Sequence, residues 1–133
     1  MNVTIVGNLC ADPEIRETSG GLAVADLRIA ENRNYQDSDG EWQTSVAYYT
    51  VQVWRRLAEN TAKSLRKGDR VVAVGRMRQD SWTTDAGEKR SRYVVDADEL
   101  AASVRFATME ITKPERLEPE TKTYGPDDPE RPF

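Results

Sequence analysis

The stretch over residues 46–57, VAYYTVQVWRRL, constrains the fold most because it alternates between two chemically different sets of side chains. In a β-strand, successive side chains point to opposite faces of the sheet. One face would carry apolar groups typical of a core: Ala47, Tyr49, Val51 and Val53. The other face would combine two large rings with hydrogen-bonding groups, where a solvated strand more often carries charges: Val46, Tyr48, Thr50, Gln52 and Trp54.

Tyr48 and Trp54 are six residues apart, which is roughly 20 Å along an extended strand. That length matches a few stacked nucleotides better than one small ligand. The alternative is that both rings pack beneath a loop or at a subunit contact. This stretch alone leaves both interpretations open.

The composition predicts one domain followed by a tail. A chain of 133 residues and 15.0 kDa is too short for two ordinary domains. Its mean hydropathy of −0.73 is low for a compact domain, which indicates that part of the chain is unstructured or depends on oligomerisation. The apolar runs are too short to span a membrane, and the N-terminus does not have the pattern of a secretion signal. We therefore expect a cytoplasmic protein without a membrane contact.

The residue inventory argues against catalysis. The chain has no histidine and one cysteine, Cys10, so Ser-His and Cys-His nucleophiles, an internal disulfide and a multi-cysteine zinc site are excluded. The acidic residues are scattered through expected turns without a metal-binding loop or a phosphate-cradling glycine loop. We expect no catalytic residue, no metal and no cofactor.

The net charge of −4 hides a basic block. Residues 55–92 hold 11 basic and 5 acidic side chains, a net charge of +6, while residues 1–54 have a net charge of −5. A phosphate-binding surface needs a local positive field, and distant acidic groups are largely screened at physiological salt. The alternative is a solvated surface of mixed charge.

The remaining chain reads mostly as strands. Strands are predicted over residues 2–9, 22–31, 69–82, 89–95 and 104–111, with a polar loop over 32–44 and an amphipathic helix over 55–67. Gly75 predicts a bend or a bulge in its strand. The loop over 32–44 contains Tyr35 and Trp42. An aromatic in such a loop either anchors the loop to the core or contacts a ligand; the sequence leaves both open for Trp42, and we favour packing.

The predicted hairpin around residues 83–88 is basic and carries a tryptophan. Alternation places Trp82 on one face with Arg76, Arg78 and Asp80, and the returning strand adds Arg90 and Arg92. A core tryptophan would have apolar residues two and four positions before it, and Trp82 has charged ones. Flat rings stack on any base, and Arg tracks phosphates without reading sequence. We therefore interpret Trp82 as a ligand contact.

Beyond Lys113 the chain changes character, because five of its six prolines follow this residue. We predict a binding domain over residues 1–112 and a disordered tail over 113–133. The end of the tail is either inert or a docking peptide, with these residues as the contacts: Asp127, Asp128, Glu130, Pro132 and Phe133.

Strands with one short helix after the third, a further hairpin and no long crossover predict an all-β, five-stranded OB-fold barrel. The chain also resembles the bacterial single-stranded DNA-binding proteins over about residues 1–110. The pieces that carry the resemblance stand in unbroken order: GNL at 7–9 with DPE at 12–14, Trp54 before RLAE at 56–59, LRKGD at 65–69, VGR at 74–76 and GEKR at 87–90.

The resemblance implies a homotetramer that wraps single-stranded DNA without sequence preference and serves replication, recombination and repair. It implies ring contacts at Tyr35, Tyr48, Trp54 and Trp82, and basic contacts at Arg56, Lys67 and Arg78. It also implies that the tail docks replication and repair proteins, although Arg131 departs from the acidic or apolar pattern of the family. The short tail and altered rings suit a specialised second copy or a phage-encoded member, which we treat as a hypothesis.

Other functions fit parts of the pattern. An OB-fold module could bind RNA or belong to a replication-restart complex, and a tetrameric scaffold could have lost DNA binding. A carboxylate-based nucleotide hydrolase would need acidic residues clustered on the face of Arg76, Arg78 and Trp82.

Overall fold

The computed structural model describes residues 1–114. The docking peptide predicted at the end of the chain lies outside the described residues. The elements, in chain order, are β1 (Asn2–Leu9), β2 (Ile15–Glu17), β3 (Ala23–Gln36), β4 (Trp42–Trp54), α1 (Arg55–Ser64), β5 (Arg70–Thr83) and β6 (Lys89–Ala102).

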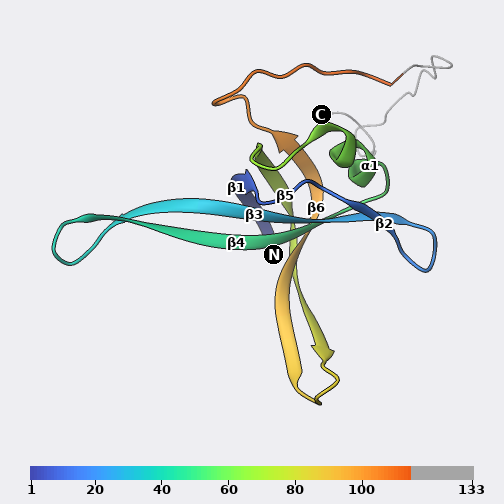
Figure 1. Cartoon of the computed structure of the whole chain (residues 1–133), viewed down its shortest axis with the longest axis horizontal. Helices are drawn as coiled ribbons and strands as arrows, with labels where there is room; N and C mark the ends of the chain where they lie inside the picture. Colours follow the sequence, from blue (N-terminus) through green and yellow to red (C-terminus); the bar gives the residue numbers. More distant parts are fainter. Residues whose placement is uncertain (115–133) are drawn as a thin grey trace, which may run out of the picture.

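The strands form one sheet in the order β1-β5-β6-β4-β3-β2, and a further pairing between β1 and β3 closes it into a barrel. Only β4 and β6 are parallel; β2 is a short addition at the outer edge of β3. The five-stranded barrel with OB topology is thus confirmed. Figure 1 shows two long hairpins, β3–β4 and β5–β6, projecting from the barrel in different directions. No helix within residues 1–114 is long and apolar enough to cross a membrane.

The barrel interior is filled by the inward rows of its strands. Alternation along β4 buries Val51 and Val53 completely, as the sequence predicts. Gly7 allows β1 to approach β3 closely, because a Cβ there would collide with the carbonyl oxygen of Ala30. The buried apolar residues of the core cluster are Ile5, Leu9, Ala25, Leu27, Ile29, Val51, Val53, Ala58, Leu65, Val71, Ala73 and Val95.

The sheet is irregular at Gly75, as predicted, but the extra residue of the bulge is Asp98 on the neighbouring strand β6, because Val74 pairs with Glu99 and Gly75 pairs with Ala97. The β5–β6 register shifts between Val74 and Gly75, and a Cβ on Gly75 would collide with the backbone of Asp96. The hairpin turn is also where it was predicted, between Thr83 and Lys89. Beyond the bulge the two strands continue into the projecting hairpin with an uninterrupted register.

The helix is shorter than predicted. It ends at Ser64, and Leu65 adopts an extended conformation while its N–H still donates to the carbonyl of Thr61. Leu65 turns into the core there, so the chain leaves the helix before the glycine stop at Gly68. The helix starts with a φ of 58° at Arg55, which is a left-handed conformation that glycine adopts at lower cost.

The prediction of a polar loop over residues 32–44 is wrong. Most of it is strand, because the β3–β4 ladder continues outward as a two-stranded ribbon to the pair Gln36 and Trp42. The polar composition of this segment suggested a loop. A two-stranded ribbon with solvent on both faces accepts polar side chains equally well. Only residues 37–41 form the turn.

The prediction of a strand over residues 104–111 is also wrong. β6 extends to Ala102 and pairs with β5 as far as Val71, so β6 itself covers this edge of β5 along its length. Residues 103–114 leave the sheet, and Val104, Phe106 and Ile111 are exposed. Phe106 lies against the guanidinium groups of Arg70 and Arg105.

Candidate nucleic-acid interface

The outward row of β4 carries the rings that the sequence predicts. Tyr48 is 54% exposed, and Trp54 is half-buried at the end of the strand. The guanidinium of Arg28, from β3, lies 4.8 Å from the centre of the Tyr48 ring, a cation–π distance. Gln52, between the two rings, is 4% exposed and thus buried within an otherwise outward row.

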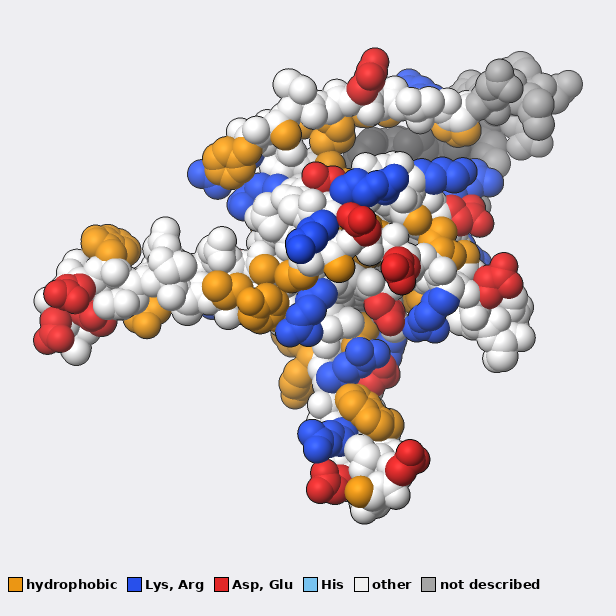
Figure 2. All heavy atoms as spheres, in the orientation of Figure 1, with side chains coloured by type: hydrophobic (Ala, Val, Ile, Leu, Met, Phe, Trp, Pro, Cys, Tyr) orange, Lys and Arg blue, Asp and Glu red, His pale blue; other side chains and the backbone are white. Residues whose placement is uncertain are grey.

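The strand register brings the two halves of the prediction onto one surface. Gln52 on β4 pairs with Asp96 on β6, and Trp82 on β5 pairs with Arg90. Paired residues point to the same side of a sheet, so the outward rows of β4, β5 and β6 form one continuous surface. We call it the ring face; it contains Tyr48, Trp54, Arg76, Arg78, Trp82, Arg90 and Arg92. Figure 2 shows Lys and Arg side chains along the β5–β6 hairpin and over the barrel, with apolar side chains beside them.

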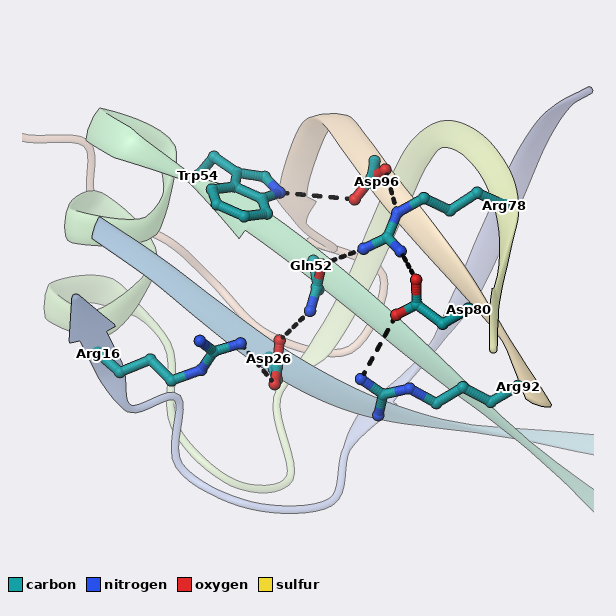
Figure 3. A network of polar contacts seen from close by, with 8 residues as sticks. All are labelled: Arg16, Asp26, Gln52, Trp54, Arg78, Asp80, Arg92 and Asp96. Carbon is teal, nitrogen blue, oxygen red and sulfur yellow. Dashed lines mark hydrogen bonds and ion pairs between the residues drawn. The ribbon is translucent and has the colours of Figure 1, made fainter. Parts of the chain in front are cut away.

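A chain of polar contacts joins the strands across this face, and Arg78 is its centre (Figure 3). The Nε of Arg78 donates to Asp96 at 2.6 Å, and its two terminal nitrogens donate to Asp80 and to the amide oxygen of Gln52. The hydrogen bond to Asp96 raises the pKa of Arg78 above its ordinary value. Arg78 therefore holds β4, β5 and β6 together beneath the rings.

The same contacts orient Trp54. Asp96, which accepts from Arg78, also lies 3.5 Å from the indole Nε1 of Trp54. On the other side of the network, the amide nitrogen of Gln52 donates to Asp26 at 2.7 Å, and Arg16 from β2 reaches the same carboxylate. The indole edge of Trp54 is thus held by the barrel, while its face remains partly accessible.

The acidic residues on this face are engaged with basic side chains. Asp26 contacts Arg16, Asp80 contacts Arg78 and Arg92, and Asp96 contacts both Arg78 and Trp54. Within residues 1–114, no group of three or more potential ligands could hold a metal ion. The carboxylates neutralise and position arginines, which does not favour the hydrolase alternative.

Trp82 lies on the projecting part of β5 and is 45% exposed. The guanidinium of Arg92 is 5.9 Å from the ring centre, and Arg90 is opposite Trp82 in the register. Two open hollows border the ring, of about 490 and 310 Å³; together they are lined by Gln79, Asp80, Ser81, Trp82, Thr83, Lys89, Arg90, Ser91 and Arg92. Shallow surfaces of this kind suit a flat base and a phosphate better than an enclosed small molecule.

Comparison with known proteins identifies relatives of this chain. Residues 1–103 match the model of the family described as "Single-strand binding protein family". The chain belongs to the single-strand binding protein family. It is 46% identical over 117 residues to the single-stranded DNA-binding protein of Corynebacterium glutamicum, covering 86% of this chain and 52% of that protein. It is 45% identical to the protein of the same name from Mycobacterium leprae, covering 86% of this chain and 69% of that protein.

The solved structures agree with the fold. A deletion mutant of the single-stranded DNA binding protein from Thermus aquaticus superimposes with a TM-score of 0.68 at 33% identity, covering 77% of this chain and 49% of that one. The chain therefore spans about half the length of some relatives in the single-strand binding protein family, and the shared part is the barrel.

Three residues assigned through the single-strand binding protein family resemblance do not lie on the ring face. Tyr35 is 49% exposed, but strand alternation places it in the row of Leu27 and Ile29, on the opposite side of the β3–β4 ribbon from Tyr48. Arg56 is exposed on α1. Lys67 is exposed in the turn before β5, where its backbone N–H donates to Asp12. No described contact links these three residues to the network around Arg78.

Trp42 was not predicted as a site residue, yet the structure places it in the row of β4 that carries the rings. The expectation that it packs against the core is wrong: its side chain is 72% exposed, and it lies in the same row of β4 as Tyr48. The signal was available, because even-numbered positions from 42 to 54 share one face once the strand is known to begin at Trp42. Sequence reasoning also missed Arg28, Gln52 and Asp96, whose roles depend on neighbouring strands.

Proposed function

We propose that this chain binds single-stranded DNA without sequence preference and protects it during replication, recombination and repair, acting in the cytoplasm on the nucleoid. The observation that carries the proposal is the ring face, where Tyr48 and Trp82 are open to solvent beside arginines and Trp54 is held edge-on by Asp96. Bases stack on the rings, and the exposed guanidinium groups beside them contact the phosphates.

The state of Gln52 supports the lack of sequence preference. Gln is one of the side chains that can read an adenine edge through both ends of its amide. Here the amide nitrogen donates to Asp26 and the amide oxygen accepts from Arg78, so both ends are occupied within the protein. The ring face then offers stacking and charge, which do not distinguish bases.

The test is quenching of tryptophan emission by oligo(dT) at two salt concentrations. Strong quenching that weakens as salt rises supports the proposal, because phosphate contacts release counterions. A preference for RNA homopolymers in competition would instead support the RNA-binding alternative. An oligomer that shows no response to either polymer would support the scaffold alternative.

We further propose that the chain acts as a homotetramer, as the family resemblance implies. The edge of β1 that faces away from β5 pairs with β3 only at Asn8 and Leu9 within the described residues, so residues 2–7 present an edge to a second copy. Val74, on the outward row of the neighbouring β5, is 38% exposed. Light scattering is expected to give about four times the 15.0 kDa chain mass.

Residues 1–112 are proposed as the DNA-binding domain and residues 113–133 as a tail that docks replication and repair proteins. Acidic residues near a terminal Pro-Phe suit a pocket with a basic rim. A peptide of residues 126–133 should compete with the whole chain for such a partner. Removal of Phe133 should weaken docking and leave oligo(dT) binding unchanged, and a loss of both would contradict the separation into domain and tail.

A further inference from the structure

Trp42 is the most exposed of the three tryptophans. Its side chain is 72% exposed, compared with 45% for Trp82, while Trp54 is half-buried. It is the first residue of β4 and lies at the tip of the β3–β4 hairpin, which projects far from the barrel (Figure 1). An indole of this size left open on a protruding ribbon is an apolar surface without a described partner.

The position of Trp42 continues the row of rings along β4. Trp42, Tyr48 and Trp54 are separated by six residues each, so all three point to the same side of the strand at intervals of roughly 20 Å. A two-stranded ribbon twists, so the row follows a curved path. Between Trp42 and Tyr48 the row and its β3 partners are uncharged: Thr44 and Val46 on β4, with Gln36, Asn34, Asn32 and Ala30 opposite.

The turn beside Trp42 is held by Asp37. One carboxylate oxygen of Asp37 accepts from the backbone N–H groups of Asp39 and Glu41, each at 2.9 Å, and the other accepts from the side chain of Gln43 at 3.1 Å. The backbone on both sides of Trp42 is thus fixed although the indole is exposed. A ring on a fixed backbone loses less conformational entropy when a ligand stacks on it.

We propose that Trp42 is a further base-stacking position, which extends the ring face along β4 to the tip of the hairpin. This inference rests on the proposed function. The ligand is a nucleobase of single-stranded DNA beyond those held by Tyr48, Trp54 and Trp82. The row holds no cation near Trp42, and the turn carries Asp37, Asp39 and Glu41, so the phosphates there face solvent and the path ends at the tip.

This arrangement distinguishes Trp42 from the basic hairpin. Stacking on Trp42 should add affinity without adding salt dependence, because no phosphate is neutralised there. It should also matter only for a strand long enough to reach the tip from the barrel. One OB fold covers about 4–16 nucleotides, so dT oligomers at the two ends of that range separate the two cases.

The first experiment compares Trp42→Ala, Trp42→Phe and the unchanged chain by anisotropy of labelled dT oligomers. For the long oligomer, Trp42→Ala should weaken binding by about 5-fold to 150-fold, the range that corresponds to one stacked base in single-strand binding OB folds. Trp42→Phe should keep most of the affinity, the short oligomer should respond to neither, and the salt slope should stay unchanged. Tyr93→Ala removes another exposed ring, from the opposite row of β6, and should have no effect.

The second experiment isolates the fluorescence of Trp42. The chain has three tryptophans, so Trp54→Phe combined with Trp82→Phe leaves Trp42 as the only indole. Its emission should be quenched by the long oligomer and not by the short one. Bound DNA without quenching would overturn the proposal.

Two outcomes separate this inference from the proposed function. If Trp42→Ala binds the long oligomer like the unchanged chain while Trp54→Ala binds it more weakly, the inference fails and the proposed function stands. If the unchanged chain itself does not bind the long oligomer, both fail. A changed mass in light scattering with native DNA affinity would assign Trp42 to a contact between copies and overturn the proposal.

Discussion

Arg78 donates its Nε–H to Asp96 across the β5–β6 pair at 2.6 Å, and this contact decides what Arg78 can do. Each of the three guanidinium nitrogens has a partner within the protein, and the side chains of Arg78 and Asp96 are 36% and 39% exposed. Sequence reasoning placed Arg78 among the DNA contacts. The contacts instead make it a positioning residue for Trp54, acting through Asp96.

Replacement of Arg78 by Ala should therefore affect stability more than charge recognition. Asp80 and Asp96 lose their closest cation, and the amide oxygen of Gln52 loses its donor, which should lower the unfolding free energy by about 1–2 kcal/mol after allowance for partial exposure. Chemical denaturation measures this change. Arg78→Lys should recover little, because an ammonium cannot serve three partners in one plane. A variant of native stability whose DNA binding loses salt dependence would mean that Arg78 contacts phosphate.

Trp82→Ala should weaken oligo(dT) binding by about 1–3 kcal/mol, the range known for base stacking in OB folds of this kind. The ring is open and packs on no core residue, so folding should be unaffected. Fluorescence titration and thermal melting test the two parts. Tyr93→Ala is the matched control from the opposite side of the same hairpin. An equal loss of affinity in Tyr93→Ala would show that both sides of the hairpin contribute equally to DNA binding.

Arg90 and Arg92 should control the salt dependence of binding. Both are exposed on the ring face near Trp82, where Arg90 pairs with Glu88 at 3.0 Å and Arg92 lies 3.9 Å from Asp80. Each phosphate contact to a single strand contributes about −0.7 to the slope of log K against log salt, so Arg90→Ala and Arg92→Ala should each make the slope shallower by about that amount. Titrations at four or more salt concentrations supply the slope. Arg33→Ala, on the opposite side of the β3–β4 ribbon and paired with Glu31, should leave it unchanged.

Arg55→Gly should stabilise the barrel. Arg55 has a φ of 58°, a conformation that costs a residue with a Cβ roughly 1–2 kcal/mol and costs glycine almost nothing. Glycine also gains entropy in the unfolded chain, so a net rise of about 0.5–1 kcal/mol in the unfolding free energy is expected. Glu59→Gly, at an exposed interior position of α1, should lower it by about 1 kcal/mol. A loss of stability in Arg55→Gly would show that the strained conformation is held by contacts of the arginine.

The hydrogen bonds that hold the β3–β4 turn should weaken with pH only under acidic conditions. Hydrogen bonds from the backbone of Glu41 and the side chain of Gln43 hold the pKa of Asp37 below its ordinary value. Because the folded pKa is depressed, the contribution of Asp37 is present above the unfolded pKa and is lost as the pH falls through the folded pKa. The protection factors of the Asp39 and Glu41 amides, which compare the exchange rate with the intrinsic rate at the same pH, should therefore be steady from neutral pH down to the ordinary aspartate range and fall below it. Asp37→Asn should make that exchange fast at neutral pH.

The alternating pattern of residues 46–54 predicted much of this surface correctly. Val51 and Val53 are buried and Tyr48 is exposed, because side-chain direction in a strand is a local property with a period of two. The same rule would have separated Tyr35 from Trp42. It was not applied to them because the polar composition of residues 32–44 suggested a loop.

Other features could not be read from any single stretch. Gln52 is buried because Asp26 and Arg78, from strands far apart in the chain, both bind its amide. Residues 104–111 alternate like a strand, yet β6 had already extended beside β5 as far as the pair Val71 and Ala102. A strand needs a free neighbour to bond with, and that depends on where the whole chain runs.

The sequence by itself determined that the chain makes a small β-barrel with aromatic and basic side chains on one outward surface, since periodicity, turn residues and charge are properties of short segments. Only the tertiary structure decided which arginines are held by carboxylates within the protein and which rings share a side. Both depend on the register between strands, and register is set by hydrogen bonds between residues distant in sequence.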